Sequence, residues 1–189
     1  MKRIVSSLAA VALAGGMMAQ ESRVSAGLEV ALPMGDFGDF VGVGFGATLG
    51  YEIPVGDNLG LIAQAGYISF TGKDYDLGII KIEGPSIGAI PIQLGAKYYF
   101  SDNQEGAYLG VLTGLHLLSS EGSDGVTNFG IAPLLGFMVT ENIDIGVRYQ
   151  LLFDKQETVS IIGTTVTTTE ENVTNSYIGI RAAYMFGSR

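Results

Sequence analysis

Residues 41–53 alternate between two kinds of side chain, and this alternation restricts the possible fold more than any other feature of the sequence. One face carries Val41, Val43, Phe45, Ala47, Leu49, Tyr51 and Ile53, and the other carries mainly glycine. A two-residue period over this length predicts a β-strand, because successive side chains leave a strand on opposite sides. An apolar outer face with a small, sparsely polar inner face is typical of a transmembrane β-barrel strand.

Seven further segments show the same alternation, although in 59–70 the inner positions include Ile62 and Ile68. The eight segments are 24–32, 41–53, 59–70, 90–100, 107–118, 129–140, 143–153 and 177–186. Each runs for about 9 to 13 residues, which is enough for a tilted strand to cross a bilayer. The sequence therefore predicts an all-β fold, an eight-stranded antiparallel up-and-down transmembrane β-barrel.

The connections between these segments alternate in length. The short connections are 54–58, 101–106 and 141–142, and the long ones are 33–40, 71–86, 119–128 and 154–174. Outer-membrane barrels have short periplasmic turns and longer outer loops. The alternation therefore predicts that both termini are periplasmic and that the four long loops face outward.

Two of the long loops have the composition of hairpins that continue beyond the membrane. Thr158 to Thr169 is dense in Thr, Val and Ile with Gly163 near its middle, and Leu77 to Glu83 has a similar pattern. We expect the Thr158–Thr169 loop to extend the last two strands outside the cell. Its free edges would then be a possible surface for a partner strand.

The N-terminus has the organisation of a secretory signal peptide. Lys2 and Arg3 precede an apolar stretch from Ile4 to Ala14, and small residues lead to Ala19. We expect cleavage after residue 19, which leaves 20–189 as the barrel domain. The alternative, a membrane-anchoring helix, is less favoured because its apolar core is short and contains two glycines.

Composition excludes several functional classes. The chain has no cysteine, so thiol catalysis and disulfides are absent. Its formal charge is -9; removal of Lys2 and Arg3 would leave 19 acids and 8 basic residues (10 minus 2), or -11. Such a chain repels nucleic acid. The Gly42-x-Gly44-x-Gly46 run lies within a strand without a following helix, so no cofactor is expected.

Aromatic residues gather near the ends of the predicted strands, as expected for two interfacial girdles. Those near the periplasmic interface are Tyr51, Tyr98, Phe100, Phe137, Tyr184 and Phe186, and those near the outer one are Phe70, Phe129, Tyr149 and Phe153. The alternative is a soluble lipocalin-like barrel with its faces reversed. The small face carries too few charged residues for a soluble surface, so the membrane barrel is favoured.

This pattern resembles the small Gram-negative outer-membrane β-barrel family of the OmpA/OmpX type, over residues 21–186. The final Tyr184-Met185-Phe186 resembles the terminal aromatic signal of that family, except that Gly187, Ser188 and Arg189 follow it. The resemblance implies an outer-membrane location, contact with outer-membrane lipid, and recognition by the barrel-assembly machinery through Tyr184 and Phe186.

The inner face is predicted to carry a polar network in the lumen. Its members are Glu29, Glu52, Gln93, Lys97, His116, Asp144, Arg148 and Arg181. Because charge at membrane depth must be paired, we expect Arg148 and Arg181 to pair with Glu29. We expect a second group of Glu52, Lys97 and Asp144, bridged by Gln93 or water. The network would lock a plugged interior, since eight strands leave just enough room for side chains; the alternative is a gate across a narrow water path.

His116 is the single histidine and invites comparison with the outer-membrane lipid A deacylases, which also have eight strands. That family places histidine and serine two residues apart on one face, whereas here the residue two after His116 is Leu118. We therefore predict no enzymatic activity and no catalytic residues.

The acidic outer loops match no defined ion-binding spacing, so no metal site is predicted.

These observations together predict an outer-membrane protein with a structural or surface-interaction role. The second hypothesis is a narrow channel for small solutes or ions. The third is a lipid-modifying outer-membrane enzyme.

Overall fold

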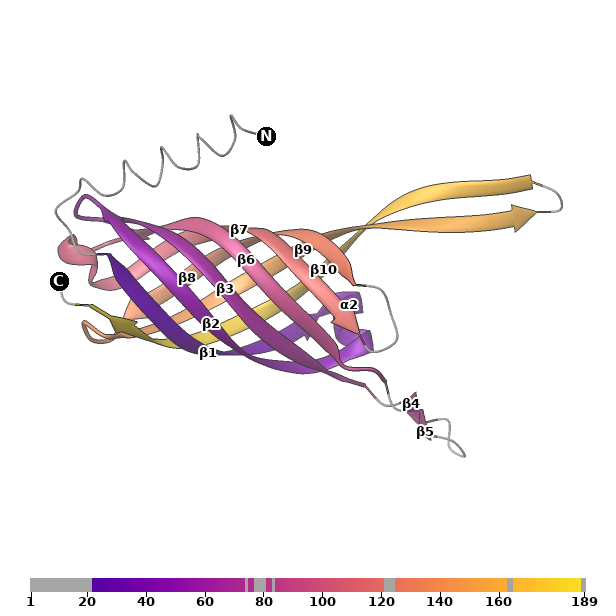
Figure 1. Ribbon diagram of the computed structural model, residues 1–189, viewed down its shortest axis with the longest axis horizontal. Coiled ribbons are helices and arrows are strands. Elements are labelled where there is room, and N and C mark those ends of the chain that lie inside the picture. Colours follow the sequence, from indigo (N-terminus) through magenta and orange to yellow (C-terminus); the bar gives the residue numbers. More distant parts are fainter. Residues whose placement is uncertain are drawn as a thin grey trace.

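Eight long strands form a closed barrel in a computed structural model of the chain (Figure 1). The structure describes residues 22–73, 75–76, 81–82, 84–120, 125–162 and 165–187, without the side chains of 75–76, 81–82, 103, 155–162 and 165–172. The barrel strands are β1 (Arg23–Met34), β2 (Val41–Val55), β3 (Leu59–Gly72), β6 (Ile87–Tyr99), β7 (Gly106–Ser120), β8 (Val126–Met138), β9 (Ile143–Ile162) and β10 (Thr165–Phe186). Every neighbouring pair is antiparallel, and β1 closes the barrel against β10. The predicted eight-stranded antiparallel barrel is confirmed.

The two ends of the barrel differ. One end, called here the turn end, carries the start of β1, the end of β10 and the short connections after β2, β6 and β8 (Figure 1). The connection after β6 contains the short helix η2 (Asp102–Gln104). The opposite end, called the loop end, carries the long connections. The predicted signal peptide, residues 1–19, lies outside the described residues and stays a prediction.

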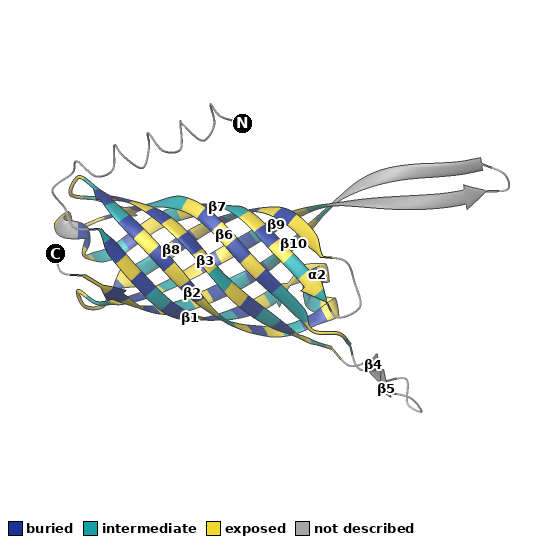
Figure 2. Ribbon diagram, in the orientation of Figure 1, coloured by how far each residue is buried: buried dark blue, intermediate teal, exposed yellow. Residues whose placement is uncertain are grey.

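The wall of the barrel has an apolar outside and a closely filled inside. Figure 2 shows buried and exposed residues alternating along the strands. On the outside Leu28 is 73% exposed and Leu94 is 65% exposed. On the inside Glu52, Lys97 and Asp144 are buried. The apolar face therefore points outward on every barrel strand, as it must where the barrel wall contacts lipid acyl chains.

Two residues that the sequence analysis placed on the outer surface lie inside. Val41 is buried because the register between β2 and β3 shifts between Val41 and Gly44, so that one additional residue of β2 turns the preceding side chain inward. Phe70, expected in the outer girdle, is buried in the lumen. Its ring meets those of Phe37 and Tyr177 edge-on, at centroid distances of 5.3 and 5.6 Å.

The first long connection contains a short helix that the sequence analysis expected only as a loop. This helix, α2 (Gly35–Phe40), turns Phe37 into the loop end of the lumen. There Phe37 joins an apolar cluster with Ala31, Val41, Ile68, Phe70, Ala89, Leu152 and Tyr177. A second buried cluster lies among the inward residues Ile62, Tyr99, Tyr108, Leu112, Ala132, Leu134, Met138 and Met185. Within the described ranges, no helix is long and apolar enough to span a bilayer.

The last two strands continue well past the barrel as a paired hairpin (Figure 1). Their register runs without interruption from Ile143↔Tyr184 to Ile162↔Thr165. Gly163, predicted to form the turn, lies outside the described residues. A smaller hairpin pairs β4 (Tyr75–Asp76) with β5 (Lys81–Ile82), whereas residues 77–80 and 83 of the second predicted hairpin lie outside the described part.

Candidate functional site

The carboxylate of Glu52 organises the lumen near the turn end. Its Oε1 atom accepts hydrogen bonds from Arg23 Nη2 at 3.2 Å and from the Tyr99 hydroxyl at 2.6 Å. Its Oε2 atom lies 3.1 Å from Lys97 Nζ. Three strands, β1, β2 and β6, supply these groups, so the contacts tie neighbouring and non-neighbouring parts of the wall together.

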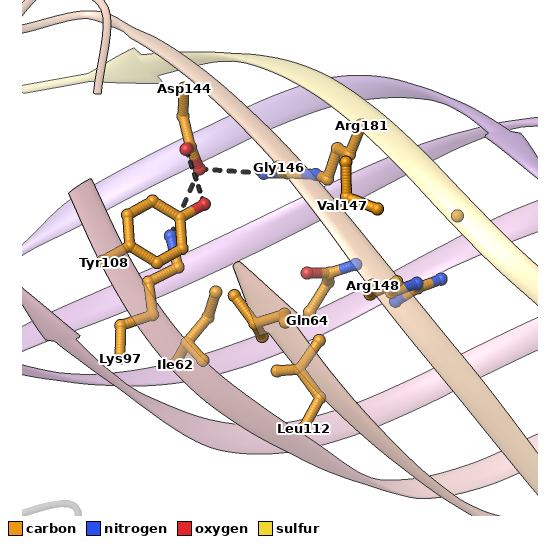
Figure 3. Close-up of a pocket in the computed structure, with 12 residues that line it drawn as sticks. Ile62, Gln64, Lys97, Tyr108, Leu112, Asp144, Gly146, Val147, Arg148 and Arg181 are labelled. Carbon is orange, nitrogen blue, oxygen red and sulfur yellow. Dashed lines mark hydrogen bonds and ion pairs between the residues drawn. The ribbon is translucent and has the colours of Figure 1, made fainter. Parts of the chain in front are cut away.

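Asp144, on β9, is the second anion of this region (Figure 3). Its Oδ1 atom accepts a hydrogen bond of 2.6 Å from the Tyr108 hydroxyl. Its Oδ2 atom lies 3.2 Å from Lys97 Nζ and 3.5 Å from Arg181 Nη1. Lys97 therefore joins the two carboxylates of Glu52 and Asp144 directly. We call Arg23, Glu52, Lys97, Tyr99, Tyr108, Asp144 and Arg181 the turn-end network.

Arg181 does not contact Glu29, although the two residues are register partners on β10 and β1. Its guanidinium reaches toward the turn end instead, where Nε donates to Thr48 Oγ1 at 2.7 Å and Nη2 donates to Ser25 Oγ at 2.9 Å. Gly27 makes this path possible: a Cβ atom there would lie 2.9 Å from Arg181 Nε. The absence of a side chain at Gly27 on β1 thus leaves the space through which Arg181 of β10 extends.

Glu29 pairs with Arg148 in a separate group nearer the loop end. Arg148 Nη2 lies 2.7 Å from Glu29 Oε1 and donates to the Tyr177 hydroxyl at 3.1 Å. Arg148 Nη1 donates to Gln93 Oε1 at 2.9 Å. The two charged side chains cross over Gly179, where a Cβ atom would come within 2.4 Å of Glu29 Oε1. We call Glu29, Gln93, Arg148, Gln150 and Tyr177 the loop-side network.

Gln93 has a different place from the one expected. The sequence analysis expected it to bridge Glu52, Lys97 and Asp144, but Lys97 itself contacts both carboxylates. Gln93 instead bonds Arg148 and donates through Nε2 to Gln150 Oε1 at 3.0 Å. Gln150 Nε2 then reaches two backbone carbonyls on β8 and β9.

His116 lies fully buried on the inner face of β7. Neither ring nitrogen has a hydrogen-bond partner among the described residues. Asn128, its register partner on β8, is also buried, and its Nδ2 atom lacks a partner in the same described part. The following Ser119 points to the outer face, away from His116. Among the described residues, Ser119 therefore does not supply a nucleophile to His116.

Several members of the networks were missed by the sequence analysis. Arg23 precedes the predicted start of the first strand by one residue, but continued alternation would have placed it inward. Tyr99 and Tyr108 face inward by the same period, but they were not counted among the members of the predicted polar network. Gln104 lies in a turn, where no periodicity points to its contact of 2.7 Å with Arg23.

The arrangement is suited to cross-linking the wall of the barrel. Each carboxylate is buried and contacts at least one cation, and a tyrosine hydroxyl also donates to Glu52 and to Asp144. Among the described residues, Glu29 Oε2 and the Nε atoms of Arg23 and Arg148 have no hydrogen-bond partner. Buried ions without partners would be strongly destabilising at membrane depth. No group of three or more potential metal-ligating side chains occurs among the described residues.

A closed antiparallel barrel of eight strands, with an apolar outer wall and a buried salt-bridge network, defines the class of small outer-membrane β-barrel proteins. The sequence agrees with that class. The profile of the outer membrane protein beta-barrel domain family matches residues 5–186, and the chain belongs to this family. The family resemblance inferred from the sequence is therefore confirmed, and the chain is a small outer-membrane β-barrel protein.

Solved structures of other small barrels share the fold. Ail, the attachment invasion locus protein of Yersinia pestis, solved in complex with the heparin analogue sucrose octasulfate, is 16% identical with a TM-score of 0.51, covering 87% of this chain and 97% of Ail. The N-terminal barrel domain of Pseudomonas aeruginosa OprF is 14% identical with a TM-score of 0.51, covering 87% and 97%. Pseudomonas aeruginosa OprG is 15% identical with a TM-score of 0.51, covering 88% and 96%. A comparison with curated proteins gave no match.

Proposed function

We propose that this protein is a closed, non-conducting barrel that anchors a binding hairpin at the cell surface, with both termini in the periplasm. The observation that carries the proposal is the filled lumen. The turn-end and loop-side networks cross the interior, and apolar clusters pack against them on both sides. Such a barrel is a rigid support whose specificity lies in its outer segments.

The interior offers little room for a continuous water path. The cavity between the two networks measures about 30 Å³, which is the size of one or two water molecules. At the loop end the rings of Phe37, Phe70 and Tyr177 pack edge-on across the lumen. These features support a plug over the alternative of a narrow channel.

Conductance distinguishes the plug from the channel. We expect purified protein in a planar lipid bilayer to give no stable single-channel steps, since ions would have to displace buried charged pairs. The Lys97→Ala/Arg148→Ala double variant is the control. It removes the central cation of each network, so it should conduct ions more readily than the wild type. Stable, ion-selective steps from the wild-type barrel would refute the plug and establish the channel.

The hairpin of β9 and β10 supports a role in surface interaction. Pairing of β9 with β8 ends at Phe153, and pairing of β10 with β1 ends at Ser176. Beyond these points, within the described part of the chain, the two strands pair only with each other, so their outer edges can accept a further strand. The partner that fits is an extended segment of another protein. The net charge of -9 does not suit a polyanion such as the heparin analogue bound to Ail.

Deletion of the hairpin tests this role. We expect removal of residues 156–171, replaced by a short Gly-Ser turn, to leave a folded barrel and to abolish binding of cells to immobilised host-surface or neighbouring-cell protein. The matched control keeps the length of the hairpin and replaces alternate residues with proline, which blocks edge pairing. Unchanged binding by both variants would refute a binding role for the hairpin.

Two further parts of the proposal concern assembly and chemistry. Exposed Tyr184 and Phe186, whose ring centroids lie 4.9 Å apart, are suited to recognition by the barrel-assembly machinery after removal of residues 1–19.

We infer no enzymatic function, because His116 is enclosed in the lumen and Ser119 faces outward. An unchanged lipid A profile after His116→Ala would agree with this inference.

A further inference from the structure

A groove lies between β8 and β9 at the point where the hairpin leaves the barrel. Pairing of these two strands ends at Phe129↔Phe153. Beyond that pair, within the described residues, 126–128 of β8 pair only with β7, and β9 from Asp154 onward pairs only with β10. The groove measures about 500 Å³, which lies in the range of about 300–1,000 Å³ that is typical of ligand-binding clefts. It therefore has a free strand edge on each side.

The opposite side of the hairpin base is different. Pairing of β10 with β1 ends at Ser176↔Met34, and α2 begins at the next residue, Gly35. The short helix contacts β10 at this end of the barrel (Figure 1). The outer edge of β10 is therefore covered at its base, whereas the outer edge of β9 opens directly into the groove. A segment that extends the sheet from the barrel outward has its free access beside β9.

The side chains around the groove suit a cationic group. The rings of Phe129 and Phe153 stack with their centroids 6.4 Å apart, and the two residues are 52% and 46% exposed. Asp154 lines the same groove. Among the described side chains, none of the ion pairs involves its carboxylate. An aromatic face and a carboxylate at one place attract the side chain of Lys or Arg.

The two connections that flank the groove are acidic as well. Residues 119–128 and 154–174 together hold six acids and one basic residue, namely Glu121, Asp124, Asp154, Glu157, Glu170, Glu171 and Lys155. Like charges brought together across an interface oppose binding. An acidic segment is therefore a poor occupant of the groove, and so is the same hairpin of a second copy of this chain. A basic segment is electrostatically complementary.

We propose that the groove between β8 and β9 is the docking site for an extended, basic segment of another protein. The segment pairs with the outer edge of β9 and places a Lys or Arg side chain against Asp154 and the Phe129–Phe153 pair. This inference rests on the binding role proposed above for the hairpin, and it specifies which edge binds and the chemistry of the partner. Backbone hydrogen bonds supply affinity, and the cation fixes the register of the bound segment.

Two matched cysteine variants distinguish the two edges, because the chain has no cysteine of its own. Thr158 on β9 and Thr169 on β10 are register partners. The probe is a set of short peptides of alternating threonine and valine with one arginine, each with a thiopyridyl-activated cysteine at a different position. A strand beside β9 lies about 5 Å from Thr158 and about 10 Å from Thr169, and a disulfide needs Cα atoms within about 7 Å. In lipid nanodiscs we expect conjugation to Thr158→Cys and not to Thr169→Cys.

The charge of the peptide tests the chemistry of the partner. We expect the arginine peptide without cysteine to bind the wild-type barrel in a fluorescence anisotropy titration, and a glutamate peptide not to bind. Asp154→Asn should weaken binding of the arginine peptide by about two- to fivefold and should leave a glutamine peptide unaffected. The matched control is Asp39→Asn on the exposed face of α2, which should change neither affinity.

Equal or stronger conjugation to Thr169→Cys would overturn the choice of the β9 edge. Equal binding of the arginine and glutamate peptides, or no binding of the arginine peptide, would overturn the basic partner. The deletion of residues 156–171 tests the hairpin separately. If cell binding depends on the hairpin while the peptide experiments give these contrary results, only the assignment of the groove is wrong. If cell binding does not depend on the hairpin, the binding role itself is wrong.

Discussion

Asp144, on the inner face of β9, has three polar partners. Its carboxylate meets Lys97, Tyr108 and Arg181, which come from three other strands. This buried carboxylate stabilises the barrel mainly by compensating the positive charges of Lys97 and Arg181, which would otherwise lie unpaired in a medium of low dielectric constant. The network as a whole therefore depends on the charge of Asp144 more than on its shape.

Neutralising Asp144 should be costly. We expect Asp144→Asn, which keeps the volume and removes the charge, to lower the free energy of unfolding by about 3–5 kcal/mol. Urea unfolding in lipid vesicles, followed by tyrosine fluorescence, measures the change. Asp57→Asn in the exposed turn after β2 is the matched control and should change stability by less than about 0.5 kcal/mol. Equal effects of the two substitutions would contradict the role given to Asp144.

Individual side chains also mark the limit of what the sequence predicts. Alternation placed Glu29, Arg148 and Arg181 on the inner face, and the structure puts all three there. It could not choose between the two arginines as the partner of Glu29, because that choice depends on where neighbouring glycines leave space. Gly27 frees a path for Arg181, and Gly179 frees one for Glu29 and Arg148. Contacts across a barrel are set by such gaps, which periodicity does not reveal.

At the scale of elements, α2 lies at the loop end of the barrel and turns Phe37 into the lumen. It is only six residues long and has no capping hydrogen bond from a side chain at its start. Its position depends on the burial of Phe37 against Phe70 and on a hydrogen bond that Lys73 Nζ donates to the Gly38 carbonyl. The sequence predicted a loop here because a helix of this length has too few residues to show a helical period.

Removal of the Phe37 ring should weaken this closure. We expect Phe37→Ala to lower the free energy of unfolding by about 3 kcal/mol through loss of buried area and creation of a cavity. It should also increase hydrogen exchange of the backbone amides in α2. The exposed Asp39→Ala substitution in the same helix is the control, with little effect on either measurement. Unchanged exchange in Phe37→Ala would mean that α2 is held by other contacts.

The strands were easier to predict than their connections. Alternation identified all eight, although less regularly in 59–70, because each has one face toward lipid and one toward a narrow interior. The ends were less well placed: the register shift beside Val41 and the long pairing of β9 with β10 depend on partners rather than on local sequence. The composition of the Thr-rich segment indicated a protruding hairpin, and its backbone pairing follows that expectation.

At the scale of the whole molecule, the closed hydrogen-bonded wall and the ionic interior predict strong resistance to detergent. We expect unboiled protein in sodium dodecyl sulfate to migrate differently from boiled protein on a gel. It should also fractionate with the outer membrane. The Asp144→Asn variant should lose its unboiled position at a lower temperature than the wild type. Identical migration before and after boiling, with the protein in a soluble fraction, would contradict the membrane barrel.

The pairing of Val24 with Phe186 has a consequence for biogenesis. The seam joins the first strand of the barrel to its last, so the barrel cannot close while β10 is still missing. A nascent chain must be kept unfolded until synthesis and export are finished. A product shortened from its C-terminus would leave β1 with bare amide and carbonyl groups facing acyl chains, and quality-control proteases would have a clear feature by which to recognise it.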